Sequence, residues 1–186
     1  MITTAITIRA ATDDDLPACL QLDLSYETDY VWQMDVRDEE GTIRVGFQTV
    51  RLPRLMRVLY PRDSEALAAV WAKCDPAQGC QLVGEVAGVV RGYLMMRADP
   101  LHDSAWITDL VVGRAWRRQT IGTTLLAEAY QWAQTHHFQR LTVETQTKNY
   151  PAICFCQRHG LTFCGFNDQY YPNYDIALFF SQIIRE

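Results

Sequence analysis

Residues 117–126, RRQTIGTTLL, combine two arginines with small and hydroxyl residues around one glycine. The mainly apolar run at residues 107–112 ends shortly before this segment, and an amphipathic stretch follows it. A short basic loop between a strand and a helix presents backbone N–H groups and the positive end of the helix dipole to an anion. The segment therefore predicts a phosphate-binding loop.

Two common phosphate-binding motifs do not occur in this sequence. A P-loop would end in Gly-Lys-Ser/Thr, and a dinucleotide-binding fold would carry GxGxxG after its first strand. Gly84, Gly88 and Gly92 lie inside strand-like sequence rather than between a strand and a helix. They indicate a turn and bulges, not a nucleotide loop.

The loop at residues 117–122 resembles the R/Q-x-x-G-x-G/A signature of the GNAT superfamily of acyl-CoA-dependent N-acetyltransferases. A second segment, NYPAICFCQRHGL at residues 149–161, resembles the N-x-x-A-x-x-F-Y-x-x-x-G-F pattern of the same family. The resemblance covers roughly residues 80–186, and the first 79 residues only through the expected order of strand and helices. It implies one N-acetyltransferase domain over residues 1–186. The implied fold is α/β (α+β), with a mixed, mainly antiparallel central sheet flanked by helices.

The resemblance implies acetyl-CoA as co-substrate. The residues that it assigns to the pyrophosphate and pantetheine are Leu110, Val111, Val112, Arg117, Arg118, Gln119, Thr120, Ile121, Gly122, Thr123, Asn149 and Phe155. The side chains of Leu110 and Val112 also suit a core, and Arg118 also suits a solvated surface position. No metal is expected, because the six cysteines form no CxxC pair and no Cys/His set with zinc-like spacing.

Four residues are candidates for catalysis: Glu144, Asp109, Cys156 and Tyr171. Glu144 occupies the position of the proposed general base in related N-terminal acetyltransferases, and an ion pair with an arginine is the alternative. Asp109 lies in an apolar run, where an unpaired buried carboxylate is costly, so contact with the amine and a structural role both stay open. Tyr170, Tyr171 and Tyr174 are candidates for a proton donor or an aromatic wall, with core packing as the alternative.

The sequence departs from the family pattern at two positions. Thr120 stands where the loop usually has glycine, and its hydroxyl is a candidate donor to a phosphate oxygen. Cys156 stands where many members have a tyrosine thought to protonate the leaving thiolate. Ile153 and Phe155 beside it indicate a buried thiol of raised pKa, so we expect Cys156 not to be needed for turnover.

The acceptor is expected to be a primary amine that attacks the thioester directly. Residues 144–149, with the pattern that follows them, resemble streptothricin acetyltransferases, whereas residues 170–172 and Asp175 resemble ribosomal-protein N-terminal acetyltransferases. The net charge of −5 suits a cationic partner. A streptothricin-like small-molecule amine is therefore favoured over a peptide N-terminus. A non-catalytic acyl-CoA sensor and a structural domain without acyl-CoA affinity are the alternatives.

Hydrophobic periodicity and turn residues outline the elements that must position these residues. Strands are expected at 6–9, 43–49, 106–112, 141–144, 161–166 and 176–184, a hairpin at 80–97 turning near 87–88, and helices from 16, at 64–73, 121–136 and 151–159. Ile121, Leu125, Ala129 and Ala133 recur every fourth residue and predict one apolar helix face. Residues 52–61 contain two prolines and are ambiguous between strand and helix.

Length and composition set the outer limits of this interpretation. A chain of 186 residues is normally one domain. Its acidic balance argues against a general nucleic-acid or anionic-membrane surface. The start MITTAITIRA lacks a signal-peptide pattern, and no run approaches the roughly 20 apolar residues of a membrane span. The sequence predicts a cytoplasmic protein, either a monomer or a homodimer.

Overall fold

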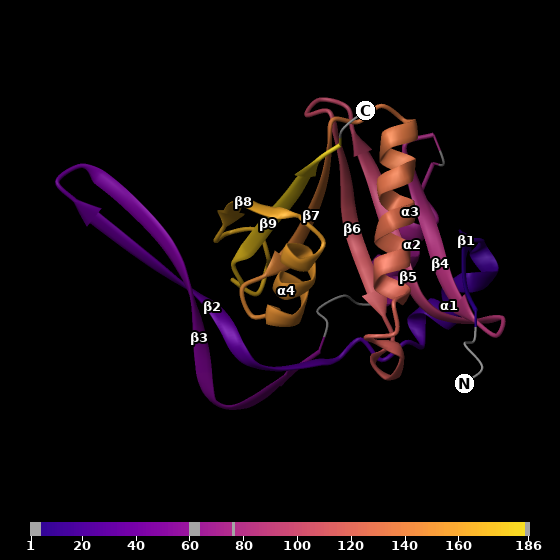
Figure 1. The fold of residues 1–186 in the computed structure, drawn as a ribbon, viewed down its shortest axis with the longest axis horizontal. Helices are drawn as coiled ribbons and strands as arrows, with labels where there is room; N and C mark the ends of the chain where they lie inside the picture. Colours follow the sequence, from indigo (N-terminus) through magenta and orange to yellow (C-terminus); the bar gives the residue numbers. More distant parts are fainter. Residues whose placement is uncertain (1–4, 60–63, 76, 185–186) are drawn as a thin grey trace. The chain divides into compact units, whose positions relative to one another are not determined.

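The computed structural model describes residues 5–59, 64–75 and 77–184 (Figure 1). The elements in chain order are β1 (Ile6–Ala10), η1 (Asp13–Asp15), α1 (Leu16–Leu20), β2 (Tyr26–Glu39), β3 (Thr42–Val58), α2 (Ser64–Trp71), β4 (Gly79–Val86), β5 (Val89–Asp99), β6 (Ser104–Val112), η2 (Arg114–Trp116), α3 (Ile121–Thr135), β7 (Arg140–Gln146), α4 (Tyr150–Arg158), β8 (Thr162–Asn167) and β9 (Ala177–Ile183). Here η marks a short 3-10 turn.

Seven strands form one sheet in the order β1-β4-β5-β6-β7-β9-β8, and β2 and β3 form a separate pair. The pairs β1/β4, β4/β5 and β5/β6 are antiparallel, whereas β6/β7 is parallel. The predicted α/β class with a mixed, mainly antiparallel sheet is confirmed. The chain divides into two compact units. The first comprises residues up to Ser25, Leu59–Val143 and the chain from Ser181, and the second comprises Tyr26–Val58 and Glu144–Phe180.

In the first unit, helix α3 covers one face of strands β4–β6, and α1 and α2 lie on the other face (Figure 1). The predicted face of α3 is confirmed, because Ile121, Leu125, Ala129 and Ala133 are all buried. On the opposite face, Trp71 of α2 packs edge-to-face against Tyr93 of β5 with ring centroids 6.1 Å apart. The predicted hairpin turn is also confirmed, since the residues between β4 and β5 adopt positive φ angles, 53° at Ala87 and 73° at Gly88.

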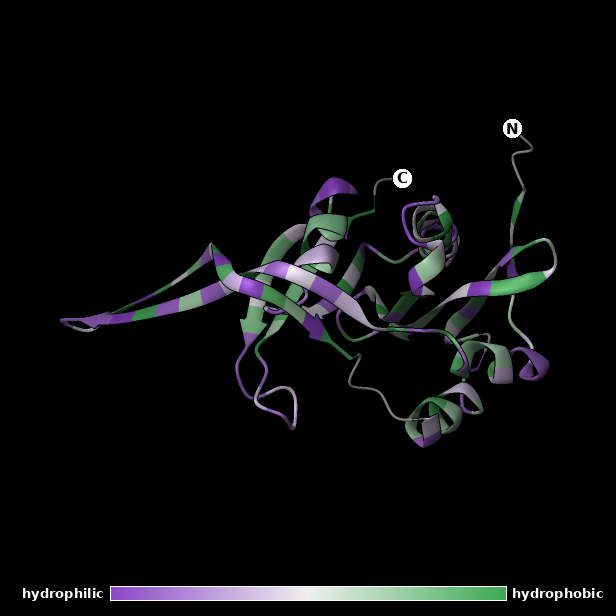
Figure 2. Ribbon diagram, turned by 90° about the horizontal axis from the view of Figure 1, so that it is seen from below, coloured by the Kyte–Doolittle hydropathy of each residue, from purple (hydrophilic) through white to green (hydrophobic). Residues whose placement is uncertain are grey.

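In the second unit, β2 and β3 form a long hairpin that the sequence predicted only in part. Its alternation of hydrophilic and hydrophobic residues is visible as bands in Figure 2. Strand β3 continues through the ambiguous residues to Val58. Pro53 is tolerated there because the register is interrupted between Thr28/Met56 and Tyr30/Arg51, so the missing proline N–H leaves the regular ladder intact.

Aromatic rings and one backbone bond attach the hairpin to the rest of the second unit. The Trp32 N–H donates to the Thr147 carbonyl at 2.9 Å. The ring of Trp32 packs against Phe47, Phe163 and Phe180 at centroid distances of 5.8–6.0 Å. Strand β2 also contacts α4, the predicted helix that begins after Asn149 and ends before Gly160 at φ 82°.

Candidate active site

The predicted phosphate-binding loop leads from η2 into α3 in the first unit. Arg118 and Thr120 both adopt left-handed conformations, with φ angles of 61° and 69°. Left-handed residues at these two positions turn the chain sharply between the extended Arg117 and the first turn of α3. Arg118, Gln119, Thr120 and Thr123 are exposed, and the 15-residue helix begins at Ile121. An exposed turn at the N-terminus of a long helix is a suitable place for an anion, and the phosphate-binding loop stays a prediction.

The side chain of Arg117 hydrogen-bonds to two backbone carbonyls. Its Nε donates to the Val112 carbonyl at 2.9 Å, and its Nη1 donates to the Ser25 carbonyl at 2.7 Å. Burial lowers the pKa of this guanidinium from its ordinary value. Two of its donors are thus used to tie the loop to β6 and to the segment before β2, so Arg117 shapes the loop.

The Thr120 hydroxyl is also engaged within the loop. Its Oγ1 donates to the Gln119 carbonyl at 2.6 Å, while the Thr120 carbonyl accepts from the Thr124 N–H at 2.9 Å. Thr120 occupies the N-cap position of α3, but its side chain makes no capping bond to the helix. The hydroxyl in this conformation does not act as the predicted phosphate donor.

Strand β6 contributes Asp109 and the predicted pantetheine-contacting residues. Asp109 is only 2% exposed and follows a register shift, because Met96 is opposite Ile107 whereas Met95 is opposite Asp109. Val111 is buried, and Leu110 and Val112 on either side of it are half-buried. The burial of Asp109 fits a structural carboxylate as well as a contact to an amine.

Glu144 lies on β7, at the start of the second segment of the second unit, and accepts hydrogen bonds from two phenol hydroxyls. Tyr170 Oη donates to Glu144 Oε2 at 2.5 Å, and Tyr171 Oη donates to Glu144 Oε1 at 3.3 Å. The two tyrosine rings meet edge-to-face with centroids 5.1 Å apart. Burial and the negative charge of Glu144 raise the pKa of Tyr171 above its ordinary value, which keeps the phenol protonated. The structure thus brings Glu144, Tyr170 and Tyr171 together.

Cys156 is enclosed in the protein interior. It lies on the buried side of α4 beside Ile153 and is 2% exposed. Burial raises the pKa of its thiol to about 12. A thiol that stays protonated and enclosed is poorly suited to act as a nucleophile. The expected buried thiol of raised pKa is confirmed, and the expectation that Cys156 is not needed for turnover stays a prediction.

The two residues predicted to contact pantetheine in the second unit also have local partners. Asn149 Oδ1 accepts from the Ala152 N–H at 3.2 Å and caps α4. The half-buried ring of Phe155 packs on His159 with centroids 4.2 Å apart. The sequence did not indicate the ion pair between Lys148 and Asp175. Asp175 was noted only as part of the resemblance to ribosomal-protein N-terminal acetyltransferases.

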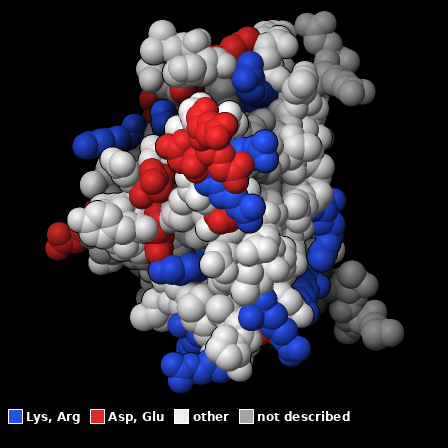
Figure 3. All heavy atoms as spheres, turned by 90° about the vertical axis from the view of Figure 1, so that its left-hand side faces the viewer, with Lys and Arg blue, Asp and Glu red and all other residues white. Residues whose placement is uncertain are grey.

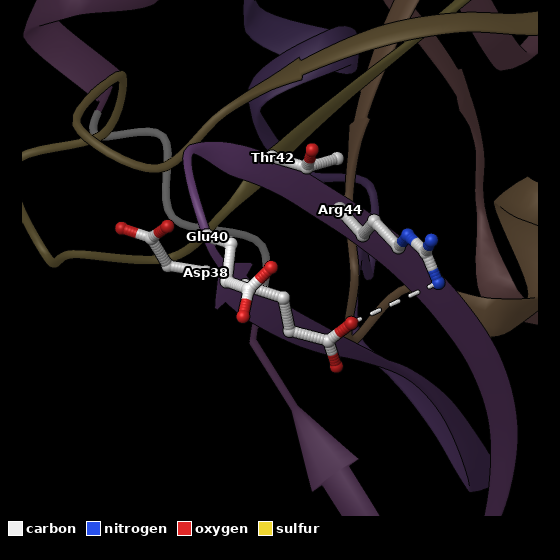
Figure 4. A pocket seen from close by; sticks show the side chains of 5 residues that line it. Asp38, Glu40, Thr42 and Arg44 are labelled. Atoms are coloured by element: carbon white, nitrogen blue, oxygen red, sulfur yellow. Dashed lines mark ion pairs between the residues drawn. The ribbon is translucent and has the colours of Figure 1, made fainter.

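An open pocket at the end of the β2–β3 hairpin is a poor candidate for the active site. It is lined by Asp38, Glu39, Glu40, Thr42 and Arg44 (Figure 4). Acidic side chains gather on this face (Figure 3), and Glu39 pairs with Arg44 at 4.0 Å. All five residues are exposed, and none belongs to the predicted site.

The part of the chain that the structure describes has neither a cluster of metal-binding side chains nor a helix that could span a membrane. No group of three or more His, Cys, Asp or Glu side chains in this part of the chain is placed to hold a metal ion. No helix within residues 5–59, 64–75 and 77–184 has the length and apolar character needed to cross a membrane.

Comparisons with known proteins give the family context. Residues 48–161 match the model of the acetyltransferase (GNAT) family. Streptothricin acetyltransferase A of Bacillus subtilis (strain 168) is 34% identical over 73 residues, which is 39% of this chain and 42% of that protein. The aligned region thus spans less than half the length of this curated relative.

Two solved structures share the fold along almost the whole chain. The nourseothricin acetyltransferase structure has a TM-score of 0.83 at 21% identity and covers 98% of this chain and 100% of its own. A candidate streptothricin acetyltransferase from Bacillus anthracis str. Ames, solved in complex with acetyl coenzyme A, has a TM-score of 0.77 at 18% identity, with 98% and 99% of the two chains covered. At these identities the likeness establishes the fold.

Proposed function

Because this chain belongs to the acetyltransferase (GNAT) family, we propose that it transfers an acetyl group from acetyl-CoA to a primary amine by direct attack. The observation that carries the proposal is the Glu144 carboxylate, to which the hydroxyls of Tyr170 and Tyr171 both donate. A carboxylate oriented by two phenols is a suitable acceptor for the N–H groups of an incoming amine. The backbone of residues 118–123 would hold the pyrophosphate, with Arg117 shaping the loop.

The reaction requires one bond to form and one to break. The neutral amine nitrogen attacks the thioester carbonyl carbon, the C–N bond forms, the C–S bond breaks and coenzyme A leaves as a thiolate. The proton lost by the amine passes to Glu144, directly or through water, and from there to solvent. A thiol has a reference pKa near 8.5, so the leaving thiolate does not require a strong acid.

A comparison of pKa values also indicates that Tyr171 orients the Glu144 carboxylate and does not donate a proton to the leaving thiolate. Its pKa is raised above the ordinary value of a phenol, which already exceeds that of a thiol. Proton transfer from Tyr171 to the thiolate would therefore be unfavourable. Holding Glu144 through a hydrogen bond needs only the protonated phenol, and this is the form that burial and the neighbouring charge favour.

We further propose a streptothricin-like small molecule as acceptor, because one relative by sequence is a streptothricin acetyltransferase by name and one by fold is a nourseothricin acetyltransferase. The sequence pattern at residues 170–172 keeps a peptide N-terminus as the alternative acceptor. A cytoplasmic location, a monomeric or homodimeric state and the absence of a nucleic-acid partner are parts of the same proposal.

The test is a panel of amines with acetyl-CoA, read by release of free thiol: streptothricin, aminoglycosides, polyamines and N-terminal peptides. We expect the highest kcat/KM with streptothricin. Preferential turnover of peptides would support the alternative acceptor. If acetyl-CoA binds but no amine in the panel causes thiol release, the result would support a non-catalytic acyl-CoA sensor. If acetyl-CoA does not bind, the result would support a structural domain.

The role of Glu144 has its own test. Glu144→Gln keeps the shape and removes the proton acceptor, so kcat/KM should fall by about 10²-fold at neutral pH and recover in part at high pH, where free amine is abundant. Glu128→Gln makes the same change at an exposed position of α3 and should leave the rate unchanged. Wild-type rates in Glu144→Gln would show that Glu144 is structural.

A further inference from the structure

The segment between β8 and β9, residues 168–176, carries both phenols that reach Glu144, and we call it the tyrosine loop. Its residues are largely exposed, and Tyr174 within it has a φ of 60°. Exposed loops usually have a low free energy of local unfolding. Two hydrogen bonds to Glu144 therefore do not by themselves explain why the loop is held in place.

A second attachment lies at the far end of the tyrosine loop. Asp175 forms an ion pair with Lys148, which follows the end of β7. The Asn173 side chain donates to Asp175 Oδ2 at 3.0 Å and accepts from the Asp175 N–H at 3.1 Å. The Thr147 N–H donates to the Ile176 carbonyl at 3.1 Å.

Asp175 is much more deeply buried than Lys148, and this difference makes the ion pair important for the position of the tyrosine loop. Asp175 is 8% exposed, whereas the Lys148 side chain is 48% exposed. A carboxylate held out of water strongly requires its cation, while the exposed lysine can be removed without leaving a buried charge of its own. Without Lys148, the Asp175 carboxylate gains by moving into solvent, and the tyrosine loop moves with it.

We propose that the Lys148–Asp175 ion pair is a latch that positions the tyrosine loop so that Tyr170 and Tyr171 reach Glu144. Glu144 and Lys148 are four residues apart, and so are Tyr171 and Asp175, so the two segments are joined at both ends. Lys148 and Asp175 are positioning residues that act through the phenols. The effect of the latch on turnover rests on the proposed function, whereas its effect on the loop does not.

Hydrogen–deuterium exchange of the whole protein tests the latch without any substrate. Lys148→Ala should increase exchange of the amides at residues 169–176 by about tenfold or more. Asp175→Asn keeps the shape of the side chain and should do the same. Lys148→Arg keeps the charge, and Lys73→Ala removes the other lysine of the chain, so both should match the wild type. Unchanged protection in Lys148→Ala would show that the ion pair does not hold the loop.

Steady-state kinetics then test positioning through Glu144. Lys148→Ala should lower kcat/KM for the amine by about tenfold through misplacement of the phenols, while KM for acetyl-CoA changes by less than about twofold. In a protein that already carries Glu144→Gln, Lys148→Ala should lower kcat/KM by less than about a further twofold. The reason is that both substitutions disturb the same hydrogen bonds between Glu144 and the two phenols. A full additional tenfold loss would mean that the pair does not act through Glu144. If the wild type turns over no amine, the proposed function fails, and the exchange experiment alone still decides whether the latch exists.

Discussion

Thr120 is the last residue before α3, and its φ of 69° lies in the left-handed region. This region is unfavourable for L-residues and most unfavourable for β-branched ones, because Cβ approaches the backbone too closely. The Thr120 hydroxyl offsets part of this cost locally through its bond to the Gln119 carbonyl. The loop thus keeps the shape that glycine gives in the family pattern, at some cost in free energy.

We expect Thr120→Gly to raise the free energy of unfolding by about 1 kcal/mol, because glycine removes the left-handed strain. In a chain of this size the melting temperature should rise by about 2–4 °C. Thr120→Ala serves as the control, since it loses the hydroxyl and the branching but keeps a Cβ, and it should be less stable than Thr120→Gly. The measurement is chemical denaturation of the three proteins, and equal stability of Gly and Ala variants would contradict the strain argument.

The sequence identified the residues of the candidate site better than it identified the hydrogen-bond partners of those residues. Glu144 and its neighbouring tyrosines were found from the family resemblance, and the structure brings them within hydrogen-bonding distance. The engagement of Arg117 could not be predicted, because its acceptor Ser25 lies 92 residues away in the chain. The packing of distant segments decides which carbonyl lies within reach of this guanidinium, and the local sequence does not determine that packing.

At the level of elements, paired glycines determine how closely α3 approaches the sheet. Gly84 of β4 and Gly92 of β5 are opposite each other in the register. A Cβ at Gly84 would lie 2.9 Å from Ile121 Cγ2, and one at Gly92 would lie 2.7 Å from the Val111 carbonyl oxygen. Both are shorter than real Cβ contacts. The absence of side chains here lets the first turn of α3, and with it the proposed phosphate loop, pack directly on the strands.

Gly92→Ala should therefore destabilise the protein by about 1–3 kcal/mol, because the added methyl group meets a backbone atom that cannot move alone. The same methyl group would lie 3.2 Å from Ile121 Cγ2, so a displaced first turn of α3 should also weaken acetyl-CoA binding, measured by calorimetric titration. Gly46→Ala in β3 is the matched control, since nothing lies within 4 Å of its added Cβ. Wild-type stability and affinity in Gly92→Ala would show that the helix can shift at no cost.

The elements that the sequence predicted best are those with a strong local signal. Helix α3 was predicted with its buried face because four apolar residues recur at the helical period. The β2–β3 hairpin was predicted only in part, because a strand pair is stabilised by its partner across the turn and by distant rings such as Phe163 and Phe180. Its turn at Glu40–Gly41, with φ angles of 50° and 82°, also lacks the Asn-Gly or Asp-Gly signature.

On the scale of the whole molecule, neither compact unit is continuous in sequence. The chain passes between the units after Ser25, Val58, Val143 and Phe180. Strands β7 (Arg140–Gln146) and β9 (Ala177–Ile183) each contribute residues to both units. Since both strands run continuously from one unit into the other, we expect their ladder hydrogen bonds to be lost together.

Calorimetry should therefore show one cooperative unfolding transition, with equal calorimetric and van't Hoff enthalpies, as for a single domain. Acetyl-CoA at 100 times its Kd should stabilise the folded state by about 2.7 kcal/mol, which corresponds to about 5–10 °C for a chain of this size. Coenzyme A without the acetyl group is the control for binding through the pyrophosphate, and it should also raise the midpoint. Because the whole chain unfolds together in this view, the ligand should shift the entire transition. Two separate transitions, or a ligand shift confined to one of them, would mean that the two units are independent domains.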